Sequence, residues 1–135
     1  SVLGNENPIV SVPGEVIPGD EFYSYDDKYI DGVAQTLIPA DLEPTTIKEI
    51  QTIALQVYQA LDCAGLARVD FLIDRDTNDV FFSEINTLPG FTPISMYPKL
   101  LSHDGIAYSD LIDRLIALAM ERKADKDKTL RSVKA

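Results

Sequence analysis

Apolar residues recur every three or four positions in a segment that begins at Pro44. This spacing is typical of an amphipathic helix, in which such residues line one face. Thr46 and Glu49 stand at the spacing of a capping box, and Gly65 is a stop signal. We therefore predict a helix between Pro44 and Gly65. Its apolar face would consist of Ile47, Ile50, Ile53, Ala54, Val57, Tyr58 and Leu61.

A second helical pattern follows Ser109, which can cap the helix. Beyond Arg122 the letters KADKDKTLRSVKA contain almost no apolar residues, so we expect residues 123–135 to form a charged flexible tail. Residues 1–122 would then form one domain. The apolar stripe of the second helix would consist of Leu111, Ile112, Leu115, Ile116, Leu118 and Ala119.

Residues 1–40 contain short apolar runs separated by turn signals. The runs are SVLG, PIVSVPGEVIP and EFYSY, and the turn dipeptides include Pro13-Gly14 and Pro18-Gly19. This pattern predicts a meander of short strands. The polar stretch from Asp26 to Gly32 is predicted to be an exposed loop.

Between the two helical patterns, the runs LARVDFLID and VFFSEIN flank the turn-rich connection RDTND. Two such runs predict an antiparallel hairpin. Side chains alternate between the faces of a strand. If the hairpin is symmetric about Thr77, Asp70 faces Glu84 and Arg68 faces Asn86. The predicted shared face carries Arg68, Asp70, Leu72, Val80, Phe82, Glu84 and Asn86.

The predicted pairing of Asp70 with Glu84 requires a compensating cation. Facing residues lie roughly 5 Å apart at Cβ, and like charges at that separation are destabilising. The oxygens of Asp, Glu and Asn suit a hard ion such as Mg²⁺ or Mn²⁺. Asp70, Glu84 and Asn86 are therefore candidate metal ligands. The alternative is that they are solvent-facing residues of a half-exposed sheet.

The second strand of the hairpin ends at Leu88-Pro89-Gly90. Because Gly90 lacks a Cβ, backbone N–H groups there can approach a ligand oxyanion closely. Pro-Gly is also a common turn dipeptide, so this signal is weak by itself.

The composition narrows the classes of partner. The chain has 22 acidic and 12 basic residues and a net charge of −10, which argues against nucleic acid as a partner. Cys63 is the only cysteine, so no disulfide can form within the chain, and the composition suits a reducing compartment. No apolar run reaches the roughly 18 residues of a membrane span. The sequence opens on Ser1 rather than Met, so we expect a part of a longer protein.

Three strings in this sequence resemble a known family. ARVDFLID and SEINTLPGFTPISMYPKL, preceded at a distance by FYSYDDKYID, are similar to the C-terminal part of D-alanine–D-alanine ligases of the ATP-grasp superfamily. The resemblance covers the chain to about Arg122. It implies an α+β fold, the ATP-grasp C-terminal domain, with an antiparallel sheet flanked by two helices.

The resemblance also implies an activity. These ligases use ATP to phosphorylate the carboxylate of one D-alanine, and the amine of a second D-alanine displaces the phosphate to give the dipeptide used in peptidoglycan. ATP and two Mg²⁺ or Mn²⁺ ions are the implied cofactors. Asp70, Glu84 and Asn86 match the metal ligands of the family, Arg68 matches its arginine beside the transferred phosphoryl group, and the N–H of Gly90 matches its oxyanion partner.

Further residues match the family's substrate and nucleotide contacts. Ser95 and the backbone of Met96 match the pocket for the carboxylate of the second substrate. Lys28 and Tyr29 match a mobile loop, in which Lys28 reaches the γ-phosphate and Tyr29 favours the dipeptide product. Phe22 is a candidate for the nucleotide base pocket, although strand core is the other interpretation.

The implied partners are D-alanine, ATP and the N-terminal and central domains of the same ligase, which have no counterpart in this chain. A homodimer is possible, and the resemblance implies a location in the cytoplasm. The alternatives are a ligase that makes D-alanyl-D-lactate or D-alanyl-D-serine, and a noncatalytic module that binds a partner through its acidic surface. His103 is expected at the surface or in a cap, and Cys63 as a small buried residue.

Overall fold

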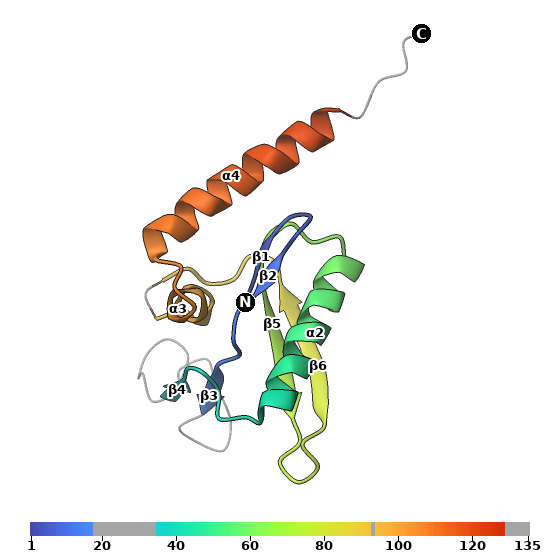
Figure 1. The fold of residues 1–135 in the computed structure, drawn as a ribbon, viewed down its shortest axis with the longest axis vertical. Coiled ribbons are helices and arrows are strands. Elements are labelled where there is room, and N and C mark those ends of the chain that lie inside the picture. Colours follow the sequence, from blue (N-terminus) through green and yellow to red (C-terminus); the bar gives the residue numbers. More distant parts are fainter. Residues whose placement is uncertain (18–34, 93, 129–135) are drawn as a thin grey trace.

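The structure is a computed structural model that describes residues 1–17, 35–92 and 94–128. It contains short strands at both ends of the first segment, a long hairpin in the middle and helices that flank the sheet (Figure 1). The elements are β1 (Val2–Gly4), β2 (Ile9–Val10), β3 (Glu15–Ile17), β4 (Gln35–Leu37), α2 (Pro44–Ala60), β5 (Gly65–Ile73), β6 (Val80–Asn86), α3 (Met96–His103) and α4 (Tyr108–Asp127). Within the described segments, no helix has the length and apolar character needed to cross a bilayer.

The main sheet has four antiparallel strands in the order β2-β1-β5-β6. β3 and β4 form a separate two-stranded antiparallel sheet. The expected α+β class with an antiparallel sheet is therefore confirmed.

Helix α2 covers one face of the main sheet. Ala54 and Tyr58 of α2 are buried with Val2 of β1 and Ala67 of β5. The Tyr58 hydroxyl donates a hydrogen bond of 2.7 Å to the backbone oxygen of Gly4, so the helix is bonded to the strand as well as packed on it.

Helices α3 and α4 cover part of the other face. Leu3 follows Val2 in β1 and therefore points to the opposite side of the sheet. It is buried with Tyr97 and Leu101 of α3 and with Leu111 of α4. Figure 1 shows α2 on one side of the strands and α3 and α4 on the other. The sequence predicts two flanking helices, and the described residues contain three.

The ends of the two predicted helices differ from the sequence expectation. α2 begins at Pro44 and has no side-chain cap bond, so the capping box of Thr46 and Glu49 is wrong. Proline fits this first position because its missing N–H would be unpaired there in any case. α4 begins at Tyr108, which puts Ser109 inside the helix rather than at its cap.

The last turns of α4 run past the predicted end of the domain. The helix continues to Asp127, five residues beyond Arg122. Lys123 pairs with Asp127 one turn later, and Lys128 pairs with Asp125. Ion pairs at these spacings support a helix that has little apolar surface. Residues 123–127, which the sequence assigns to a charged flexible tail, are therefore helical in the structure.

Candidate functional site

The hairpin of β5 and β6 brings the predicted polar residues together. Arg68 is the partner of Asn86, and Asp70 is the partner of Glu84, as the sequence predicts. Residues opposite each other in an antiparallel pair share a face of the sheet. The four side chains therefore lie on one face.

A β-bulge changes the second half of the hairpin. The register shifts between Asp70 and Phe71, so that Phe71 faces Phe82 and one extra residue, Ser83, lies between Phe82 and Glu84 on β6. The rings of Phe71 and Phe82 meet edge to face with centroids 6.2 Å apart. The bulge moves Phe82 to the face opposite Glu84, because each extra residue reverses the alternation.

The prediction that Val80 and Phe82 lie on the same face as Asp70 is therefore wrong. Val80 faces Ile73, on the α2 side of the sheet. Leu72 and Phe81 are the pair that continues the face of Asp70 and Glu84, and their exposed fractions are 66% and 55%. An exposed apolar pair therefore adjoins the acidic residues.

Arg68 supplies positive charge beside the two carboxylates. Its Nε lies 2.8 Å from Oδ1 of Asp70, and a terminal guanidinium nitrogen lies 2.8 Å from Oδ2, which is the forked geometry of a strong arginine–carboxylate pair. The same terminal nitrogen lies 3.6 Å from Oε1 of Glu84. One guanidinium facing two carboxylates leaves this cluster with a net negative charge.

The donor atoms of the cluster fit a hard divalent ion. Asp70 and Glu84 offer carboxylate oxygens on an open face, where the side chain of Glu84 is 62% exposed. Within the described parts of the chain, no three His, Cys, Asp or Glu side chains gather as a metal-binding group. An ion at this pair would therefore complete its shell with the Asn86 oxygen, water and ligand oxygens, as Mg²⁺ commonly does.

Asn86 has a second role at the end of β6. Its side-chain oxygen accepts a hydrogen bond of 3.0 Å from the N–H of Leu88 and so turns the chain out of the strand. A carboxamide oxygen has two lone pairs, so one is left for a ligand.

The loop after β6 brings Gly90 and Ser95 together. A Cβ at position 90 would lie 2.9 Å from Oγ of Ser95, so only glycine allows this hydroxyl to approach so closely. The ring of Phe91 anchors the loop, with centroids 5.8 Å from Tyr97 and 5.5 Å from Tyr108. The predicted oxyanion partner and the predicted pocket residue are thus neighbours.

Ser95 stands at the N-cap of α3, but its side chain makes no cap hydrogen bond. The third residue of α3 is Pro98, which has no N–H for a capping oxygen to accept. The hydroxyl of Ser95 instead contacts Thr92, whose N–H donates to it at 3.0 Å and whose Oγ1 lies 2.9 Å from it. Thr92 is a site residue that the sequence pattern does not reveal, since its only signal is its place in the string GFT.

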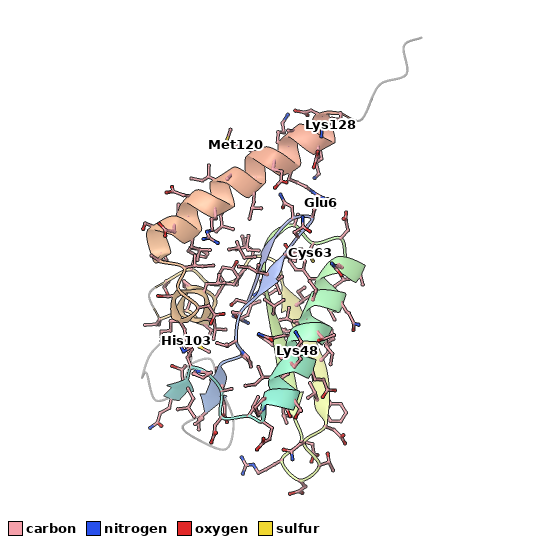
Figure 2. All side chains as sticks on the ribbon, viewed as in Figure 1. Glu6, Lys48, Cys63, His103, Met120 and Lys128 are labelled. Atoms are coloured by element: carbon pink, nitrogen blue, oxygen red, sulfur yellow. The ribbon has the colours of Figure 1, made fainter. Side chains whose placement is uncertain are left out.

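Other candidates fall outside this arrangement. Lys28, Tyr29 and Phe22 lie outside the described residues. His103 ends α3 beside Asp104, in keeping with the expected surface position (Figure 2). Cys63 is half-buried, and burial raises the pKa of its thiol, which makes it a poor nucleophile.

The fold is shared with solved ligase structures. The D-alanine–D-alanine ligase from Coxiella burnetii matches with a TM-score of 0.80 and 41% identity, over 94% of this chain and 32% of that chain. The VanG D-Ala:D-Ser ligase from Enterococcus faecalis matches with a TM-score of 0.73 and 34% identity, over 87% of this chain and 34% of that chain. The domain therefore has the fold of the corresponding third of these ligases.

Sequence comparison defines the family. A family model described as D-ala D-ala ligase C-terminus matches residues 1–117, and the chain belongs to this family. The D-alanine–D-alanine ligase of Caldicellulosiruptor bescii is 54% identical over 93% of this chain and 35% of its own length. That of Clostridium acetobutylicum is 52% identical over 90% of this chain and 36% of its own length. The chain thus spans about a third of the length of these relatives.

Proposed function

We propose that this chain is the C-terminal part of an ATP-dependent ligase that joins two D-alanines into D-alanyl-D-alanine for peptidoglycan precursors. The observation that carries the proposal is the pairing of Asp70 with Glu84 across the hairpin, beside the guanidinium of Arg68. Family membership and relatives named D-alanine–D-alanine ligase support the same activity. A reaction that consumes ATP and free D-alanine belongs in the cytoplasm.

Asp70, Glu84 and Asn86 would hold two divalent ions, Mg²⁺ or Mn²⁺. When bound with ATP, the ions neutralise phosphate charge and orient the terminal phosphoryl group. The net negative charge of the cluster and its oxygen donors support this assignment. A noncatalytic acidic module offers no comparable reason for two carboxylates to face each other on one hairpin.

Two hydrogen-bond donors of this chain would act in the first half-reaction. The first D-alanine's carboxylate oxygen attacks the γ-phosphorus, ADP leaves, and an acyl phosphate results. Arg68 lies beside the carboxylates, where its guanidinium can donate to the transferred group, and the N–H of Gly90 would donate to the developing oxyanion. Fixed donors of this kind act where charge develops in the transition state.

The second half-reaction uses the loop after β6 and α3. The amine of the second D-alanine attacks the acyl carbon, loses a proton, and phosphate leaves. Ser95 and the N–H of Met96 would hold that substrate's carboxylate at the start of α3, where the helix dipole favours an anion. Lys28 and Tyr29 would close over the site and exclude water, and Phe22 would contact the nucleotide base.

The test replaces Glu84 in the complete ligase. Glu84→Gln keeps the shape of the side chain and removes its charge. We expect ATP turnover with D-alanine to fall about 10- to 100-fold or more, because the metal site would lose a charged ligand. Glu49→Gln makes the same change on the exposed surface of α2 and serves as the control. Near-normal turnover in Glu84→Gln would contradict the metal site and favour the noncatalytic module.

A second acceptor is supported by one of the solved relatives. The match to a D-Ala:D-Ser ligase keeps D-serine as a candidate, whereas the higher identity to D-alanine–D-alanine ligases favours D-alanine. A coupled assay that offers D-alanine, D-serine and D-lactate to the same enzyme decides between them. Preference for D-serine or D-lactate would refute D-alanine as the acceptor and leave the metal-site proposal intact.

A further inference from the structure

Thr92 and Ser95 form a small hydrogen-bonded unit in the loop between β6 and α3. The backbone closes the turn, with the N–H of Ser95 donating to the carbonyl of Thr92 at 2.9 Å. The side chain of Ser95 receives the N–H of Thr92 at 3.0 Å, and the two hydroxyl oxygens lie 2.9 Å apart. Thr92 is exposed, so its hydroxyl is not needed to fill the core.

The direction of the hydroxyl–hydroxyl bond decides what Ser95 can do. A serine hydroxyl has one proton to donate and two lone pairs that accept. The N–H of Thr92 uses one lone pair. If the Thr92 hydroxyl donates to the other, both lone pairs are occupied and the proton of Ser95 is left for a ligand. If Ser95 donates to Thr92 instead, that proton is consumed.

An anionic ligand selects the first direction. A carboxylate accepts only, so it attracts the Ser95 proton, and a Thr92 proton donated into Ser95 polarises that bond further. The usual competitor for a serine at a helix N-cap is absent in this case, because Ser95 makes no cap hydrogen bond to α3. Gly90 allows the Ser95 hydroxyl to lie close to it, because a Cβ at this position would be only 2.9 Å from the Ser95 oxygen.

We propose that Thr92 is a positioning residue, which directs the hydroxyl proton of Ser95 towards the carboxylate of the acceptor amino acid. This inference rests on the proposed function, in which Ser95 binds that carboxylate. Thr92 does not touch the substrate. It fixes the donor direction of the residue that does, and so sets acceptor affinity rather than the rate of phosphoryl transfer.

The experiment compares hydroxyl-free and hydroxyl-bearing variants in the complete ligase. Thr92→Val keeps the shape and removes the hydroxyl, Thr92→Ala removes it without the β-branch, and Thr92→Ser keeps it. We expect the KM for the second D-alanine to rise roughly 3- to 10-fold in Thr92→Val and Thr92→Ala, as for loss of one hydrogen bond. Thr92→Ser should stay within about twofold of wild type, and the KM for ATP should not change in any variant.

A double-mutant cycle with Ser95→Ala separates positioning from a structural effect. Ser95→Ala should raise the acceptor KM by at least about 10-fold, since a bond to a charged group is lost. Adding Thr92→Val to Ser95→Ala should then cost nothing more. Equal costs in both backgrounds would overturn the inference.

The remaining outcomes distinguish the inference from the function on which it rests. An unchanged acceptor KM in Thr92→Val together with a raised one in Ser95→Ala would overturn the role of Thr92 and leave the pocket in place. An unchanged acceptor KM in Ser95→Ala would refute both the pocket assignment and the inference.

Discussion

Arg68 and the two carboxylates beside it determine the local charge of the hairpin face. The guanidinium forks onto Asp70 and reaches within 3.6 Å of Glu84, so it relieves the repulsion that their pairing would otherwise cause. It does not cancel both charges. The two carboxylates therefore still attract a further cation. Their repulsion is reduced enough for the hairpin to form.

Tyr58 provides a residue-scale test of the packing between α2 and the sheet. Burial raises the pKa of its hydroxyl from 10.0 to about 12, and the hydroxyl donates to Gly4. A raised pKa means that the folded state holds the proton more tightly, so this stabilisation is complete below pH 10 and is lost as the pH rises through about 12.

We therefore expect the free energy of unfolding to fall by about 2 kcal/mol more in wild type than in Tyr58→Phe as the pH rises from 10 to 12, because each pKa unit is worth about 1.4 kcal/mol and most of the two-unit difference is expressed in this range. Urea unfolding across this range measures it. Burial also raises the pKa of Tyr97, and the charge of an ionised Tyr58 adds to that shift, so Tyr97 cancels in the difference except for this smaller contribution. Parallel curves for the two proteins would contradict the prediction.

At the scale of elements, α3 links the core to the loop that carries Ser95. Leu101 and Tyr97 of α3 are fully buried against Leu3 and Leu111, and the Tyr97 hydroxyl donates to the carbonyl of Val2 at 3.1 Å. At Gly14, a Cβ would lie 2.6 Å from the terminal methyl of Met96, so the residue just before β3 lies close to the start of α3. These contacts hold the start of the helix in place.

Removing the central contact of α3 should destabilise the whole chain. Leu101→Ala leaves a cavity in the core, and we expect it to lower the free energy of unfolding by about 2–5 kcal/mol. Leu61→Ala is the control, because this side chain is 59% exposed and its loss should cost no more than about 0.5 kcal/mol. Similar values for the two variants in chemical denaturation would show that α3 is not part of the core.

The elements with strong periodicity could be predicted from the sequence, and α3 could not. Apolar residues spaced three or four apart predict the two helices, and apolar residues that alternate along the chain predict the hairpin. The letters MYPKLLSH are too few to establish a period, and Pro98 looks like a helix breaker although it is harmless in the first turn. The start of α4 follows Ala107, which carries no capping signal.

The candidate site was predictable where it depends on alternation, and not where it depends on tertiary contacts. Asp70 and Glu84 face each other because the predicted register holds up to that pair. Phe82 was misplaced because a bulge follows, and the sequence contains no clear mark of it. Thr92 was missed because its role depends on a turn that folds its N–H and hydroxyl onto Ser95.

At the scale of the whole molecule, the described residues leave part of the hairpin uncovered. α2 covers one side of the sheet, and α3 and α4 cover part of the other (Figure 1). Leu72 and Phe81 are exposed beside Asp70 and Glu84 on the hairpin. The net charge of −10 disfavours a bare polyphosphate. Under the proposed function, divalent ions between the phosphates and the carboxylates would remove that obstacle.

The most direct test of this account is a crystal structure of the complete ligase with ADP and Mg²⁺. We predict ions on the open face of the hairpin, with oxygens of Asp70, Glu84 and Asn86 at about 2.1 Å and phosphate oxygens among the other ligands. A nucleotide bound without ions at these residues, or with both carboxylates turned away from the ions, would contradict the central claim.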